Sequence, residues 1–285
     1  MSAAIQISVT QTGLGIIAGS GALPRMMMKA CAQTGRPFFV IALDGSADDE
    51  TIKMAGDAVA MVRIGAIGKI IDTLREHQVG EIVLAGKVAR PKLTSLRPDM
   101  KGTKLLARVG SQLVTGDNDL VNNIIQFVEE EGFHVIGADT VMKDLLAPEG
   151  LIGSIYPDKR AQADIEFGAR IARDIGALDI GQAVVIQNNT VLGVEAVEGT
   201  DQLIERCANL KLEERGGVLV KVKKPQQDAR VDLPTIGVPT IERLAAAGLV
   251  GIAVEAGATL ILDRRELARR ADALGLFVIG FSILE

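Results

Sequence analysis

The chain has 285 residues, of which 48% are hydrophobic, 24% are charged and 3% are aromatic, and its formal net charge is −5. An acidic chain with so few aromatic side chains lacks the basic surface and the stacking platforms on which nucleic-acid binding depends. No apolar run is long enough to cross a bilayer, and no basic patch precedes an apolar segment at the N-terminus, so we expect a soluble cytoplasmic protein.

Cysteine and histidine are too sparse to indicate a disulfide or a zinc site. Cys31 and Cys207 lie far apart in helix-like surroundings, and His77 and His134 are isolated in the sequence. We therefore expect the cysteines to be buried as small hydrophobic side chains.

The first half of the chain alternates short apolar runs with amphipathic stretches. The runs predict strands over 13–18, 38–43, 58–62, 81–85 and 134–137, and the amphipathic stretches predict helices over 22–33, 69–77 and 116–131. The segment 90–111 has the composition of a long loop or of short helices. This alternation is typical of a parallel sheet covered on both faces, so residues 1–148 are predicted to form a Rossmann-like domain.

The second half predicts another α/β domain, with a mixed sheet, over residues 149–285, because Pro148 and Gly150 mark a break in the pattern. Two β-rich runs within 182–197 are joined by Asn188 and Asn189, which predicts a hairpin. The remaining pattern predicts helices over 159–175, 199–208, 241–247 and 264–273, and strands over 218–223, 250–254, 260–262 and 276–281.

A charged stretch follows the apolar run at 218–220. If this stretch is extended, Asp228, Arg230 and Asp232 lie on one side of the chain, with Lys224 in line before them. Arginine and lysine can clamp phosphate oxygens, while paired carboxylates hold a hard divalent cation or a water. The alternative is a solvated loop whose charges pair with one another.

A glycine turn, Gly19-Ser20-Gly21, separates the first predicted strand from the first predicted helix. Its spacing does not match the G-x-G-x-x-G dinucleotide pattern, but backbone N–H groups at a helix N-terminus can bind an anion without the full pattern. A tight turn with only a structural role is the alternative. Lys87 and Arg90 follow the fourth predicted strand, at the edge where open α/β sheets bind ligands.

A second helix start is predicted at Gly199 and Thr200. Thr200 can cap the helix, and the N–H groups beyond it can face a phosphate. Glu195, Glu198 and Asp201 gather at the same place and would repel a bare phosphate, so a bridging cation is needed. Solvent exposure of these carboxylates is the alternative explanation.

Short motifs along nearly the whole chain, taken in order, resemble those of the LpxI-type UDP-2,3-diacylglucosamine pyrophosphatases. These motifs are IAGSGALP (17–24), AGKVARP (85–91), GDNDLV (116–121), LDIGQAVVI (178–186), VEAVEGTD (194–201), KPQQDARVDLPTIG (224–237) and EAG (255–257). Each motif alone is weak, but together and in this order they are specific.

The resemblance implies a magnesium-dependent hydrolase of Gram-negative lipid A biosynthesis, which cleaves UDP-2,3-diacylglucosamine to UMP and 2,3-diacylglucosamine 1-phosphate (lipid X). It also implies two domains that hold the lipid between them, and peripheral contact with the cytoplasmic face of the inner membrane. Hydrolysis of a pyrophosphate by water needs mainly positioning and neutralisation of charge, which suits the basic and acidic residues described above.

The resemblance also assigns roles to residues. Asp232 is our first choice for the essential carboxylate, which binds Mg²⁺ or orients water, and Asp228 is the second; Arg230 and Lys224 would bind the phosphates. The candidate metal ligands are Asp232, Asp228, Glu195 and Asp201. The candidate substrate contacts are Gly19, Ser20, Gly21, Lys87, Arg90, Gln182, Gly199 and Thr200.

Two other functions stay open at this point. A non-catalytic nucleotide-sugar binding protein would need the basic residues but not the carboxylates. An NAD-linked oxidoreductase would bind nicotinamide cofactor at the glycine turn, with Asp44 on a ribose hydroxyl. The sequence leaves open which phosphorus is attacked, which acyl chains fit and whether the protein is a homodimer.

Overall fold

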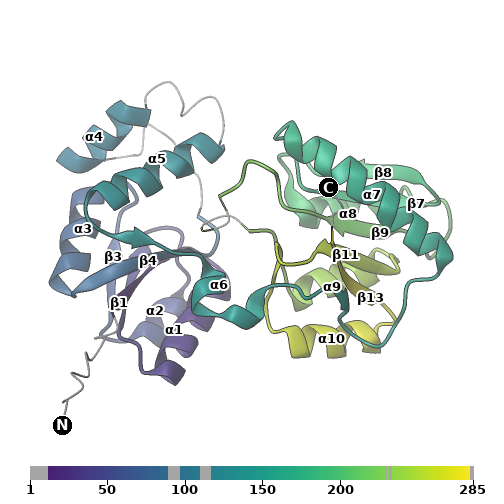
Figure 1. Cartoon of the computed structure of the whole chain (residues 1–285), viewed down its shortest axis with the longest axis horizontal. Coiled ribbons are helices and arrows are strands. Elements are labelled where there is room, and N and C mark those ends of the chain that lie inside the picture. Colours follow the sequence, from purple (N-terminus) through teal and green to yellow (C-terminus); the bar gives the residue numbers. More distant parts are fainter. Residues whose placement is uncertain (1–11, 89–96, 110–116, 229, 231–232, 283–285) are drawn as a thin grey trace, which may run out of the picture. The chain divides into compact units, whose positions relative to one another are not determined.

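The computed structural model describes residues 12–88, 97–109, 117–228, 230 and 233–282. The chain divides into two compact units, Met1–Met142 and Lys143–Glu285 (Figure 1). The boundary predicted from the sequence, between residues 148 and 149, lies later in the chain than this division. Each unit is an α/β structure with its own sheet, so the predicted fold class is confirmed.

The first unit contains a five-stranded parallel sheet in the order β3-β2-β1-β4-β5. Its strands are β1 (Gly13–Ala18), β2 (Phe38–Leu43), β3 (Val59–Val62), β4 (Val79–Ala85) and β5 (His134–Val135). Its helices are α1 (Leu23–Thr34), α2 (Asp49–Ala55), α3 (Ile67–Glu76), α4 (Met100–Val109), α5 (Asp117–Glu130) and α6 (Ala138–Val141). The strand order reverses between β1 and β4, and such a point is where open parallel sheets bind ligands.

Helices cover both faces of this sheet, which is why its central strands are apolar on both sides. On one face α3, α4 and α5 pack against the sheet, through side chains that include Ile71, Leu105 and Phe127. The buried side chains of α1, which contacts β1, α2 and α6, include Met27, Met28 and Cys31. The predicted Rossmann-like layer is therefore present.

The second unit contains a six-stranded mixed sheet in the order β6-β13-β11-β9-β7-β8. Its strands are β6 (Gly150–Leu151), β7 (Ala183–Gln187), β8 (Thr190–Val194), β9 (Val218–Lys221), β11 (Gly251–Glu255) and β13 (Phe277–Phe281). β9, β11 and β13 are parallel, whereas β6, β7 and β8 pair antiparallel with their neighbours. A separate parallel pair consists of β10 (Thr235–Ile236) and β12 (Leu260–Ile261).

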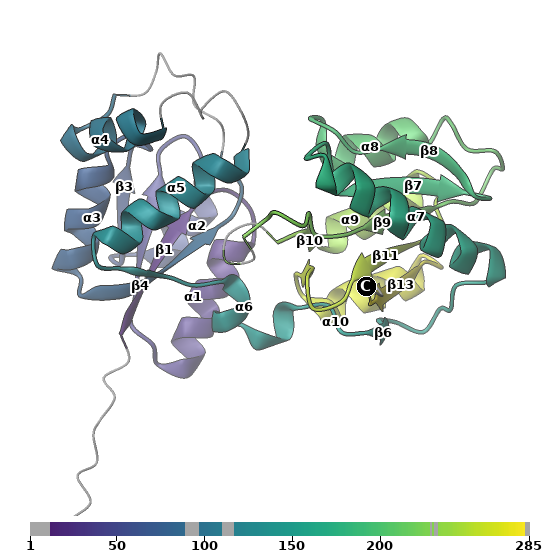
Figure 2. The same ribbon diagram turned by 45° about the horizontal axis from the view of Figure 1, so that its top comes forward.

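One long helix, α7 (Lys159–Ala177), lies along one face of the mixed sheet, as the turned view in Figure 2 shows. Gly168 lets this helix approach closely, because a Cβ there would lie 2.7 Å from Val220 Cγ2. The opposite face is covered by α8 (Gly199–Cys207), α9 (Val238–Ala246) and α10 (Arg264–Ala273). In the described part of the chain, no helix combines the length and the apolar character needed to cross a membrane.

Local sequence signals account for several details of this fold. The hairpin turn between β7 and β8 has φ values of 52° at Asn188 and 55° at Asn189, as predicted for asparagine in a tight hairpin. The segment expected to be a loop or short helices contains the ten-residue helix α4. Helix α2 was not predicted, because seven residues are too few to show a helical period.

Candidate functional site

The carboxyl edge of the mixed sheet collects polar residues in the second unit. Strands β9 and β11 are parallel and end at this edge; β7 runs the other way and begins there, and β8 ends there. Residues that end or adjoin these strands therefore meet at one edge, and four of them are polar: Gln182, Glu195, Lys221 and Glu255. This is the edge at which α/β sheets usually bind ligands.

A chain of hydrogen bonds connects a buried cation to a buried carboxylate at this edge. Lys221 Nζ donates to Thr200 Oγ1 at 2.9 Å, and Thr200 Oγ1 donates to Glu195 Oε1 at 2.6 Å. Glu195 Oε2 accepts from the backbone N–H of Gln182 at 3.0 Å. Lys221 is 6% exposed and Glu195 is 5% exposed. We call Lys221, Thr200, Glu195 and Gln182 the edge network.

Gln182 brings an unused acceptor to the same edge. Its backbone oxygen accepts from Val222 N–H at 2.9 Å, which fixes its position beside β9. Its Oε1 atom is buried and has no hydrogen-bond partner among the described residues. A buried acceptor without a donor costs about 1–3 kcal/mol. An N–H or O–H group of a ligand would remove this cost.

The acidic residues that the sequence gathers at the start of α8 are held by separate partners. Glu198 pairs with Arg206 at 2.9 Å, and Asp201 pairs with Arg243 at 3.5 Å. Hydrogen bonds from its own backbone N–H and from Arg206 lower the pKa of the Glu198 carboxyl. Within the described ranges, no three acidic, histidine or cysteine side chains are close enough together to hold a metal ion. The metal roles of Glu195 and Asp201 stay predictions.

The charged stretch after β9 begins with a turn, so the condition that it is extended is not met there. Gln227 N–H donates to Lys224 O at 3.1 Å across this turn. Lys223 N–H donates to Glu255 Oε2 at 2.7 Å, which fixes the start of the stretch to β11. Lys224 Nζ pairs with Asp179 Oδ1 at 2.8 Å. The amine predicted to bind phosphate is thus already beside a carboxylate.

Arg230 and Asp228 form a forked ion pair within this stretch. Arg230 Nε lies 3.0 and 3.1 Å from the two Asp228 oxygens, and Nη2 lies 2.7 Å from Oδ2. Hydrogen bonding from the Arg230 side chain lowers the pKa of Asp228. The structure therefore brings these two predicted residues together, while Asp232 lies outside the described residues.

In the first unit, the glycine turn after β1 meets the end of β4. Ser20 N–H donates to Lys87 O at 2.8 Å, and Lys87 N–H donates to Ser20 O at 2.9 Å. A Cβ on Gly19 would lie only 2.2 Å from Lys87 O, so this approach requires glycine. The structure thus brings the predicted Gly19, Ser20, Gly21 and Lys87 together at the point where the strand order reverses. Arg90 lies outside the described residues.

An internal carboxylate occupies part of this turn. Asp48 accepts from Gly21 N–H at 3.0 Å, pairs with Arg25 at 2.7 Å and caps α2 by accepting from Thr51 N–H at 3.0 Å. Although burial acts to raise it, these hydrogen bonds hold the pKa of Asp48 well below its ordinary value. The Gly21 N–H, which the sequence offers to a ligand anion, is therefore already used by the protein itself.

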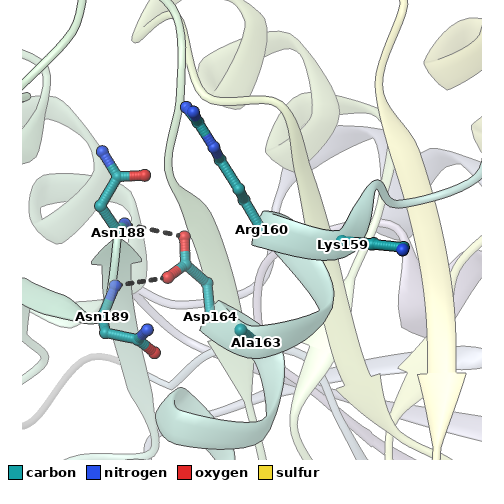
Figure 3. A pocket seen from close by; sticks show the side chains of 6 residues that line it. All are labelled: Lys159, Arg160, Ala163, Asp164, Asn188 and Asn189. Atoms are coloured by element: carbon teal, nitrogen blue, oxygen red, sulfur yellow. Dashed lines mark hydrogen bonds between the residues drawn. The ribbon is translucent and has the colours of Figure 1, made fainter.

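A pocket of about 310 Å³ lies at the other edge of the mixed sheet (Figure 3). Asp164, which is 3% exposed, accepts from the N–H groups of Asn188 and Asn189 at 3.0 and 2.7 Å and so holds the hairpin turn. Lys159 and Arg160 from the start of α7 complete the lining with Ala163. None of the residues predicted to form the site lies here, and each bond drawn in Figure 3 serves the hairpin.

Lys221 is a buried residue of this site that has no predicted role in the sequence-based assignment. The signal for it was present: a lysine directly follows three buried aliphatic residues at 218–220. From the sequence alone, Lys221 groups with the charged residues that follow it. Its burial depends on α8 and β8, which lie elsewhere in the chain, so the local pattern does not show it.

Comparisons with known proteins cover both units. A model described as the LpxI N-terminal domain matches residues 13–145, and one described as the LpxI C-terminal domain matches residues 148–279. The chain is 44% identical over 273 residues to the UDP-2,3-diacylglucosamine pyrophosphatase LpxI of Caulobacter vibrioides; the match covers 94% of this chain and 96% of that relative.

Likeness to solved structures is much weaker. The biotin carboxylase domain of Hydrogenobacter thermophilus 2-oxoglutarate carboxylase is 15% identical, with a TM-score of 0.26, and the match covers 70% of this chain and 41% of that chain. Carboxyaminoimidazole ribonucleotide synthase of Aspergillus clavatus is 13% identical, with a TM-score of 0.23, and the match covers 71% and 45%. At these TM-scores neither likeness bears on the fold or the chemistry of this chain.

Proposed function

The chain belongs to the LpxI family, and from this premise we propose that it hydrolyses the pyrophosphate of UDP-2,3-diacylglucosamine to UMP and 2,3-diacylglucosamine 1-phosphate, a step of lipid A biosynthesis. One observation carries the proposal: the relative named for this activity is 44% identical over 94% of the chain. The match of both domain models, in order, supports it.

The reaction places a water oxygen on one phosphorus and breaks the bond from that phosphorus to the bridging oxygen. Negative charge grows on the leaving phosphate, so the site must supply cations at fixed positions. We assign Arg230 and Lys224 to the phosphates. In the free protein each already holds a carboxylate, Asp228 and Asp179 respectively. A phosphate oxygen would therefore replace one anionic partner by another.

The forked pair favours Asp232 over Asp228 as the essential carboxylate. Both oxygens of Asp228 accept hydrogen bonds from Arg230, so its task in the free protein is to hold that guanidinium. We propose that Asp232, two residues beyond Arg230 in the sequence, orients the attacking water.

We further propose that the hydrolysis depends on Mg²⁺. This ion usually keeps several waters and binds one or two carboxylates together with substrate phosphates. Among the described residues, Glu195 uses both its oxygens within the edge network and Asp201 is paired, so a cage made only of these residues is not indicated. Asp232 together with substrate phosphate oxygens fits the ion's chemistry, and the ion would supply charge neutralisation there.

The diacylated substrate leads us to propose peripheral contact with the cytoplasmic face of the inner membrane of a Gram-negative cell. Three exposed aliphatic side chains support this contact: Leu178 and Ile180 precede β7, and Val197 follows β8. The two loops touch beside the edge network, since a Cβ on Gly181 would lie 2.1 Å from Glu195 O. Flotation with anionic vesicles, repeated with Leu178→Ser and Val197→Ser, tests this contact.

The activity is tested by UMP release from UDP-2,3-diacylglucosamine with Mg²⁺, with EDTA, and with Asp232→Ala. We expect release that EDTA abolishes and that the variant loses while still binding substrate. Asp174→Ala, an exposed change on α7, is the matched control and should release UMP as the wild type does.

Each other outcome has its own meaning. UMP release that continues in EDTA would refute the proposed metal dependence and would still support the hydrolase activity. Binding without release by the wild type would leave a nucleotide-sugar binding protein, and cleavage in labelled water would identify the phosphorus that is attacked.

A further inference from the structure

Lys221 is a buried charge where an aliphatic residue would fold more easily. It is the last residue of β9, and the three residues before it, Val218, Leu219 and Val220, are fully buried. Lysine is almost never buried without a partner, because the ammonium loses its hydration. Its presence at this position therefore lowers the free energy of unfolding relative to an aliphatic residue unless its contacts compensate.

The hydrogen bonds of the edge network have a fixed direction of donation, from Lys221 through Thr200 to Glu195. An ammonium can only donate hydrogen bonds, so Thr200 Oγ1 accepts from Lys221 at 2.9 Å and directs its own hydrogen to Glu195 Oε1 at 2.6 Å. The Glu195 carboxylate can only accept, and its other oxygen takes the Gln182 N–H. The ammonium thus fixes both the rotamer and the hydroxyl hydrogen of Thr200.

This network connects two parts of the proposed site. Thr200 is the second residue of α8, whose N-cap residue, Glu198, makes no side-chain capping bond. Lys221 immediately precedes the stretch that carries Lys224, Asp228 and Arg230. Through the edge network, the start of α8 and the beginning of the stretch that follows β9 are held at the same edge of the sheet.

We propose that Lys221 is a positioning residue of the hydrolysis, acting through Thr200 and Glu195 to hold the start of α8 against the strand from which Lys224 and Arg230 follow. The inference rests on the proposed function and adds a residue to it. Lys221 lowers the barrier because the phosphate-binding groups need no rearrangement at the moment of reaction.

The test compares pairs of variants that differ in one chemical property. Lys221→Met removes the charge and keeps an unbranched side chain, whereas Lys221→Arg keeps the charge. Thr200→Val removes the hydroxyl at nearly constant shape, whereas Thr200→Ser keeps it. Lys211→Met, in the loop after α8, is the matched control, because Lys211 is half-buried and, among the described residues, its amine donates only to Glu214 O within that loop. Each variant is measured for kcat, for KM in UMP release and for thermal midpoint.

We expect Lys221→Met and Thr200→Val each to lower kcat by about 10- to 100-fold, the size of a lost hydrogen bond to a charged group, with much smaller changes in KM. Lys221→Arg and Thr200→Ser should recover most of the loss, and Lys211→Met should match the wild type. Because the two residues act as one unit, the double variant Lys221→Met with Thr200→Val should be no slower than the slower single variant.

The inference is overturned if Lys221→Met keeps the wild-type kcat at a temperature where it is folded, whatever its thermal midpoint. It is also overturned if the two losses multiply in the double variant. Should Lys221→Met fail to fold, the Thr200→Val and Thr200→Ser pair carries the same test. Absence of UMP release by the wild type would refute the proposed function instead, so the two failures are distinguishable.

Discussion

Replacing Glu195 by glutamine tests whether charge holds the edge network together. In the wild type, one carboxylate oxygen accepts from the Thr200 hydroxyl and the other accepts from Gln182 N–H. A glutamine amide has one oxygen that accepts and one NH₂ group that only donates. Either the Thr200 hydroxyl or the Gln182 N–H would therefore face the NH₂ group instead of an oxygen. The chain of hydrogen bonds from Lys221 then ends on a neutral group.

The expected loss follows from the burial of both charges. A hydrogen bond to a charged group contributes about 1.5–3 kcal/mol, and removing one partner of a buried ion pair costs about 3–5 kcal/mol. The two figures count the same lost interaction in part, so they are not added. We expect Glu195→Gln to lower the free energy of unfolding of the second unit by about 3 kcal/mol. Adding Lys221→Met removes the second charge, and the double variant should be about 1–3 kcal/mol more stable than the sum of the single effects.

Hydrogen exchange of the amides in β7 and β9, followed by mass spectrometry, measures this loss within the second unit. The method gives a local free energy and does not require a chain of two units to unfold in one step. Glu198→Gln is the matched control, because this carboxylate pairs with exposed Arg206, and an exposed pair contributes at most about 1 kcal/mol. A loss below about 0.5 kcal/mol for Glu195→Gln, or additive effects in the double variant, would refute the argument.

Three further predictions concern other parts of the chain. Asp48→Ala removes the cap of α2 and should destabilise the first unit by about 1–2 kcal/mol at pH ~7. The folded-state pKa of Asp48 is depressed, so the contribution of its carboxylate to the free energy of unfolding is fully present above the unfolded pKa of about 4. That contribution is lost as the pH falls from there towards the folded-state pKa. The urea midpoints of wild type and variant should therefore converge in acid. Gly19→Ala places a methyl group 2.2 Å from Lys87 O and should cost at least about 2 kcal/mol; an unchanged thermal midpoint would contradict the close approach. Arg230→Lys keeps the charge but cannot form the fork seen with Asp228, so kcat/KM for UMP release should fall by about 10-fold or more, and wild-type kinetics would exclude a forked phosphate contact.

Elements with strong local signals could be predicted closely. The boundaries of β1, β2 and α10 agree with the prediction, because the two buried apolar strands are followed directly by Gly19 and Asp44 and α10 starts after the capping Asp263. The hairpin turn was also predictable, since consecutive asparagines adopt the positive φ values that a two-residue turn requires.

The pairing of charges was not predictable, because it depends on contacts between distant segments. Lys224 pairs with Asp179, 45 positions earlier in the chain, and Lys221 reaches Glu195 through a threonine on another helix. The strand period of two residues and the helix period of 3.6 residues show which face a side chain lies on, but not which carboxylate a given amine pairs with. The side-by-side arrangement that an extended stretch after β9 would give is also not realised at its start, because Pro225 and Gln226 form a turn there.

The cations of the second unit fall into two groups that differ in how easily they can change partner. The Lys224 side chain is 19% exposed and that of Asp179 is 38% exposed, and the Arg230–Asp228 pair is similarly open to water. Ion pairs in such surroundings contribute little free energy, so a phosphate can displace the carboxylate at small cost. Lys221 and Glu195 are buried, and separating them would leave charge in a dry interior. The exposed pairs are therefore suited to exchange their partners with each substrate molecule, whereas the buried network is suited to stay unchanged and keep the exchanging groups in place.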